Sequence, residues 1–72
     1  MKQRIINLLE ERIENKYKQI RHLQRDKSMY QYNARFGSFQ SASEDALRRA
    51  NRGIKILRKD IERLERMVEW LQ

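Results

Sequence analysis

Seventy-two residues with a formal net charge of +7 and no cysteine or proline set narrow limits on this chain. A single core of this size seldom supplies more than about 3 to 5 kcal/mol of net stability, so well-ordered helix packing or self-association is needed. Neither a disulfide nor a thiolate metal site can form, and the one histidine, His22, cannot hold a metal alone, so we expect no metal and no cofactor.

The first residues combine a basic start with an apolar run, but the run is too short for a signal peptide. Asn7, Glu10 and Glu11 interrupt it before it reaches signal-peptide length. No segment approaches the roughly 20 apolar residues that cross a bilayer. We therefore expect a soluble protein, and a chain without cysteine fits the reducing cytoplasm.

A heptad pattern predicts a long first helix over about residues 2–32. Its apolar residues lie three and four apart and form a seam along one side of the helix: Ile6, Leu9, Ile13, Ile20, Leu23 and Tyr30. Two seam positions hold lysine, Lys16 and Lys27, whose stems can lie on apolar surface while the ammonium groups reach water. Asn33 and Gly37 can take the left-handed backbone that ends helices, so the helix is expected to stop near them.

The next segment, 29–41, concentrates four of the six aromatic residues: Tyr30, Tyr32, Phe36 and Phe39. We expect a loop over about residues 33–41, with one phenylalanine covering Tyr30 and Leu47. Tyr32, Arg35 and the other phenylalanine would then form an accessible tip that meets a partner. The alternative is that the whole cluster closes the end of the core.

A second helix is predicted over about residues 42–71. Ser41 and Glu44 have the spacing of a capping box, which satisfies free backbone amides at a helix start. The seam that follows is unbroken over its whole length: Leu47, Ala50, Ile54, Leu57, Ile61, Leu64, Val68 and Leu71. The alternative is a break at 51–53 and three helices. A glycine inside a helix costs only about 1 kcal/mol, and the seam passes Gly53 without a phase change, which favours one continuous helix.

Two seams of matching length predict an all-α, two-helix antiparallel coiled-coil hairpin that forms a single domain over residues 1–72. If Tyr30 lies across from Leu47, paired residue numbers sum to 77 and every seam residue finds a partner. Lys27 then lies opposite the small Ala50. The same register brings Glu10 near Glu65, which is mildly unfavourable.

Further apolar residues lie beside the seams at the end where the termini meet. We expect four of them to form an oligomer interface: Ile5, Leu8, Met67 and Trp70. A broad apolar strip on so small a protein is typical of a self-association or partner surface. Dimerisation of the hairpin into a four-helix bundle is the preferred interpretation.

Charge is distributed unevenly along the predicted hairpin. Residues 16–59, the loop half, hold twelve Lys or Arg and three acids, a net charge of +9, and the remaining terminal half has a net charge of −2. The basic residues expected to contact an acidic partner or a polyanion are Lys18, Arg21, Arg25, Arg35, Arg48, Arg52, Lys55 and Lys59.

Three classes of function remain, and none is enzymatic. The chain has no phosphate-binding glycine loop and no nucleophile elbow, and its neighbouring acids diverge on a helix, so we expect no small-molecule substrate. The preferred class is an assembly protein that binds an acidic partner protein. The alternative is a sequence-independent nucleic-acid-binding module using the same basic half. Membrane binding is disfavoured because the two seams cover each other.

Overall fold

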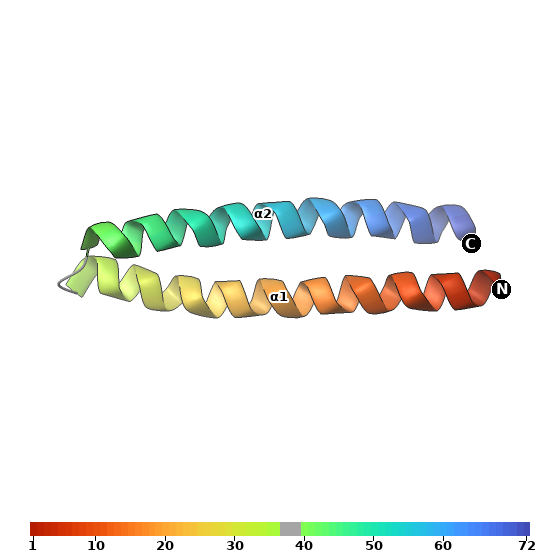
Figure 1. The fold of residues 1–72 in the computed structure, drawn as a ribbon, viewed down its shortest axis with the longest axis horizontal. Coiled ribbons are helices and arrows are strands. Elements are labelled where there is room, and N and C mark those ends of the chain that lie inside the picture. The colour runs from red at the N-terminus through yellow and green to blue at the C-terminus, as the bar shows by residue number, and fades with distance from the viewer. Residues whose placement is uncertain (37–39) are drawn as a thin grey trace.

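A computed structural model describes residues 1–36 and 40–72 and contains two long helices (Figure 1). Helix α1 spans Lys2–Phe36 and helix α2 spans Gln40–Leu71. The helices run antiparallel, and the first and last residues lie at the same end. The molecule is a rod with extents of 55 × 14 × 11 Å, which confirms the predicted all-α helical hairpin.

The predicted seams form the core. Near the termini, Ile6, Leu9 and Val68 are buried together, and a second buried cluster joins Ile20, Ile54 and Ile61. Half-buried leucines and Ile13 fill the layers around both clusters. The heptad spacing therefore holds the helices together, because each seam removes the other from water.

Helix α2 passes through the predicted break without interruption, so the three-helix alternative is wrong. Gly53 is half-buried at the contact with α1, and a Cβ added to it would lie 3.2 Å from Cδ1 of Leu23. The glycine thus allows a close approach of the two helices. The predicted register pairs Leu23 with Ile54, so the contact of Leu23 with Gly53 agrees with it to within one residue.

Both helices extend further toward the loop than predicted. Helix α1 continues past Asn33 to Phe36, and α2 begins at Gln40, so Ser41 lies inside the helix and is not its N-cap. The seams also gain a layer that the sequence analysis missed, since Ser43 is buried and Ala34 is half-buried one seam step beyond the predicted last pair. No proline opposes this extension. The predicted stop at Gly37 lies outside the described residues.

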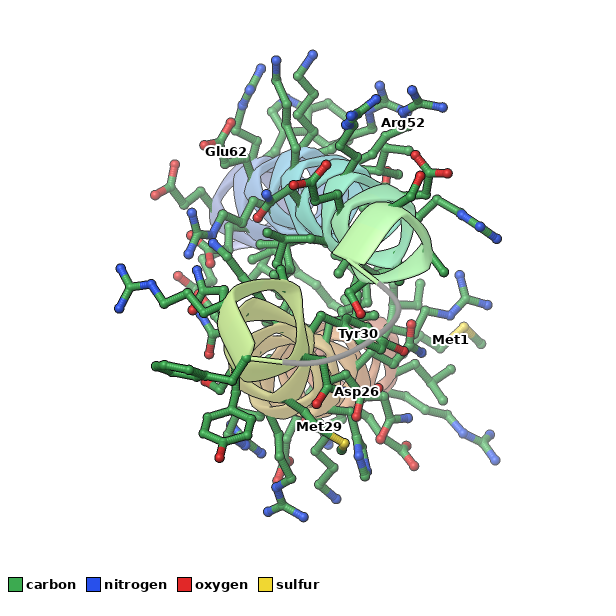
Figure 2. The ribbon with its side chains drawn as sticks, turned by 90° about the vertical axis from the view of Figure 1, so that its left-hand side faces the viewer. Met1, Asp26, Met29, Tyr30, Arg52 and Glu62 are labelled. Atoms are coloured by element: carbon green, nitrogen blue, oxygen red, sulfur yellow. The ribbon has the colours of Figure 1, made fainter. Side chains whose placement is uncertain are left out.

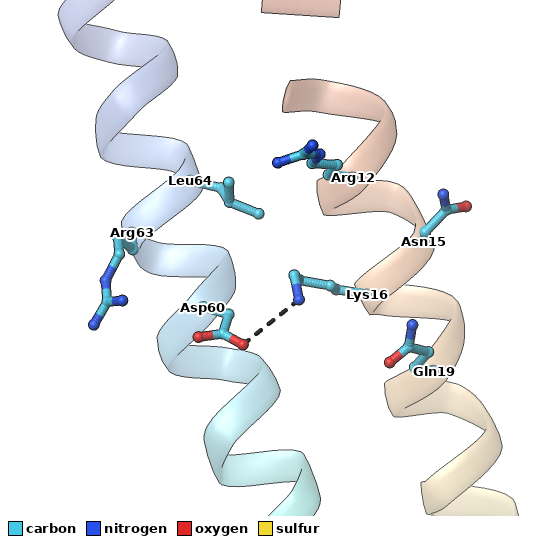
Figure 3. A pocket seen from close by; sticks show the side chains of 7 residues that line it. All are labelled: Arg12, Asn15, Lys16, Gln19, Asp60, Arg63 and Leu64. Carbon is cyan, nitrogen blue, oxygen red and sulfur yellow. Dashed lines mark ion pairs between the residues drawn. The ribbon is translucent and has the colours of Figure 1, made fainter. Parts of the chain in front are cut away.

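Polar contacts across the helices differ from the prediction at two places. Lys16 Nζ does not simply reach water but lies 3.5 Å from Asp60 Oδ2 (Figure 3). The Tyr17 hydroxyl donates a hydrogen bond of 3.3 Å to Glu65 Oε1, the carboxylate that was predicted to face Glu10. The Lys16 and Asp60 side chains are 28% and 38% exposed. The ion pair therefore contributes at most about 1 kcal/mol to the free energy of unfolding.

Candidate interaction surfaces

A groove between the helices in the loop half collects four cationic side chains. Lys27 of α1 and Lys55, Arg58 and Lys59 of α2 line this basic groove. Gln24 and Asn51 add uncharged polar groups, and Glu62 is its one carboxylate. Because four cations share one open groove, the groove suits an extended anionic ligand better than a single anion.

Three of the predicted basic residues of α1 lie side by side. Lys18, Arg21 and Arg25 line one hollow together with His22, and all four side chains are exposed. This cluster belongs to the surface of α1 alone, since no residue of α2 contributes to the hollow. His22 thus adds to a cationic surface and has no neighbouring nucleophile among the residues that line it.

The predicted basic residues of α2 divide into two groups. Lys55 and Lys59 line the basic groove, whereas Arg48 lies 3.8 Å from Asp45 one turn away. Arg52 is exposed on the outer side of α2, as Figure 2 shows. The remaining predicted residue, Arg35, belongs to α1 and lines a separate hollow near the loop with Glu44 of α2. Lys55 and Lys59 are therefore the predicted residues best placed to act together with α1.

Sequence reasoning missed two members of the basic groove. Lys27 was predicted only as a seam lysine whose ammonium group reaches water, and Arg58 was not among the predicted contact residues. Both could have been found from the heptad alone. Lys27 is itself a seam position, and Arg58 directly follows the seam residue Leu57, so both lie beside the other helix.

The four predicted interface residues at the terminal end are all exposed. Trp70 is 86% and Leu8 57% exposed, and Ile5 and Met67 are each about half exposed. The neighbouring seam residues Leu9 and Val68 are buried. One chain therefore covers its seam at this end but leaves a cluster of large apolar side chains uncovered.

The aromatic residues before the loop belong to α1 and remain accessible. The rings of Tyr32 and Phe36 contact each other in a tilted arrangement, with centroids 5.1 Å apart and an interplanar angle of 48°. These side chains are 64% and 72% exposed, so neither closes the end of the core as the alternative required. Phe39, the other candidate for covering Tyr30 and Leu47, lies outside the described residues.

Replacing Phe36 by alanine is expected to change the free energy of unfolding by less than about 0.5 kcal/mol, because its main neighbour is another exposed ring. The affinity for a fluorescent single-stranded oligonucleotide should fall roughly fivefold or more if bases stack on this pair. Urea unfolding and fluorescence anisotropy measure the two quantities. Tyr30→Ala, which truncates a half-buried seam residue, is the control and should lower stability instead. A large loss of stability in the Phe36 variant would show that the ring is part of the core.

A second hollow, midway along the rod, has mixed charge. Arg12, Lys16, Asp60 and Arg63 line it together with Asn15, Gln19 and Leu64 (Figure 3). The Lys16–Asp60 pair crosses from one helix to the other inside it. Because its main acid is already paired, this hollow is weaker as an anion or cation site than the basic groove.

Within residues 1–36 and 40–72, no group of three or more His, Cys, Asp or Glu side chains is placed to hold a metal ion. Neither described helix has a stretch that is long and apolar enough to span a membrane. Comparison of the chain with protein-family models, with curated proteins and with solved structures gives no match.

Proposed function

We propose that this chain is a small, non-enzymatic interaction and assembly protein. It self-associates through the apolar terminal end and binds an acidic partner protein through its basic loop half. The observation behind this proposal is the exposure of Trp70 and Leu8 beside a seam that is already covered. A marginally stable hairpin gains most from covering such side chains with another chain.

Self-association can be tested by sedimentation equilibrium of the wild type and of Trp70→Ala. The wild type should be a dimer, and the dissociation constant of the variant should be roughly thirtyfold higher, since truncating a large aromatic contact residue costs about 2 kcal/mol or more. Tyr17→Ala, which removes an exposed aromatic ring elsewhere on the rod, is the matched control and should leave the dimer intact. A wild type that stays monomeric at millimolar concentration would contradict the proposal.

Nucleic-acid binding is the second candidate function, and the basic groove supports it. Lys and Arg side chains of the groove could neutralise successive phosphates, and the accessible Tyr32 and Phe36 rings could stack on bases nearby. Co-purification of nucleic acid that high salt removes would favour this candidate over an acidic protein. For either partner we propose a cytoplasmic location, because a chain without cysteine has no disulfide to lose there.

A further inference from the structure

Most of the exposed large apolar residues lie on one flank of the hairpin, and four of them lie near the termini. Six of them each immediately precede a seam residue of their own helix: Ile5, Leu8, Met29, Ile56, Met67 and Trp70. In an antiparallel hairpin, such positions on the two helices meet on the same side. We call this side the apolar flank.

The opposite flank has a different character. Residues that immediately follow a seam residue include Tyr17 and Glu65, which are hydrogen-bonded to each other across the helices. They also include Lys55 and Arg58 of the basic groove. Figure 2 shows Asp26, which precedes the seam position Lys27, on one side of the rod and Glu62, which follows the seam residue Ile61, on the other. The two flanks therefore differ: one is polar and basic, and the other carries most of the exposed apolar side chains. Midway along the rod this second flank also holds Arg12, Asp60 and Arg63, which line the mixed-charge hollow.

We propose that a second copy of this chain covers the apolar flank along its full length, in an antiparallel arrangement that places the loop end of each hairpin on the terminal end of the other. This inference rests on the proposed self-association and specifies its geometry. The terminal cluster of each copy remains in the contact, but it packs on the loop half of the partner.

The size of the flank is sufficient for a stable dimer. A rod 55 Å long and two helices wide, at about 10 Å per helix, offers a footprint of roughly 1,100 Å² per copy. A standard specific interface uses about 800 Å² per partner. Contact over the terminal end alone would cover only a fraction of this area, so the full-length contact is the one that matches a stable dimer.

Side-chain size favours the antiparallel orientation. The large residues Met67 and Trp70 lie at the terminal end of α2, and the small residues Ala42 and Ala46 precede seam positions at its loop end. Ile56 lies at the middle of α2, two heptads from both Trp70 and Ala42. A two-fold axis at Ile56 therefore brings the large side chains of one copy onto the small side chains of the other, which allows close packing.

Charge favours the same orientation. The loop half has a net charge of +9 and the terminal half a net charge of −2, so a dimer with both loop ends together would place two strongly positive halves side by side. The antiparallel dimer instead pairs each positive half with a negative one. The arrangement does bring Arg49 and Arg63 of different copies near each other, which is mildly unfavourable. Arg49 shares a hollow with Asp26, whereas Asp60 beside Arg63 is already paired with Lys16.

Single cysteines introduced into this cysteine-free chain test the geometry. Because Ile56 lies on the proposed axis, Ile56→Cys should form a disulfide-linked dimer under a mild oxidant, as two cysteines bond only when their Cα atoms lie within about 7 Å. A mixture of Met67→Cys and Ala46→Cys chains should form a linked heterodimer. Glu62→Cys, on the opposite flank, is the control and should stay unlinked.

Two other outcomes would overturn the proposed geometry, and they are distinguishable. Linkage of a Leu8→Cys and Met67→Cys mixture without linkage at position 56 would show a dimer with its terminal ends together. That result would leave the proposed self-association standing. A monomer in sedimentation, with no linkage in any variant, would contradict both the geometry and the self-association.

Discussion

Replacing Ile61 by alanine is expected to unfold most of the protein at 37 °C. Ile61 is 3% exposed and lies in the central cluster with Ile20 and Ile54. Truncating a buried isoleucine to alanine costs about 2 to 5 kcal/mol, and a core of this size supplies little more than about 3 to 5 kcal/mol in total. Loss of helical circular dichroism during thermal or urea unfolding measures the effect.

The control for this result is Ile61→Val, which removes one methylene group and should cost only about 0.5 to 1.5 kcal/mol. The valine variant should remain folded with a lowered midpoint. If the alanine variant is as stable as the wild type at matched protein concentration, the central cluster is not the main source of stability. Association between copies would then supply it.

Replacing Lys55 and Arg58 together by glutamine is expected to lower affinity for duplex or single-stranded DNA on the order of a hundredfold at about 50 mM salt. Both residues line the basic groove, and the substitutions leave the seam untouched. The wild type should show a slope of log K against log salt near −4 to −5, and the double variant should lose about two units of that slope. Fluorescence anisotropy across a salt series measures both quantities.

Lys2→Gln with Arg4→Gln is the matched control, because it removes the same net charge from exposed positions of the terminal half. This control should bind almost as well as the wild type if the groove is the contact. Equal losses in the two double variants would show that only net charge matters. The absence of any binding at low salt would favour an acidic protein as the partner.

The heptad predicted the hairpin, its register and nearly all of its buried residues, because spacing alone decides which side chains two helices can bury. The bounds of the loop were predicted less well. Asn33 and the Ser41–Glu44 spacing are typical of helix ends, yet a further seam layer at Ala34 and Ser43 continued both helices past them. The extra layer of helix–helix contact outweighed these local signals for a helix end. Such a layer depends on both helices, so no short segment of the sequence reveals it.

The candidate surfaces were predicted in part. Residue type identified the basic loop half and the apolar terminal end, but it did not show which cations share a groove or that Lys16 pairs with Asp60. Those facts depend on where long side chains reach across the helices. The flank on which most of the exposed apolar residues lie was nevertheless accessible from the sequence, because it follows from whether a residue precedes or follows its neighbour in the seam.

Because both chain ends lie at one end of the rod, the hairpin responds to force differently in different directions (Figure 1). Tension between residues 1 and 72 pulls the two helices apart from their terminal ends. It therefore breaks the layer around Ile6 and Leu71 first and then each later layer in turn. Each layer resists with only the few kcal/mol that its own buried side chains supply. Tension from the loop to one chain end would instead run along the backbone of a single helix and would not separate the layers. The hairpin is thus stiff to force along its axis and weak to force that pulls its two chain ends apart.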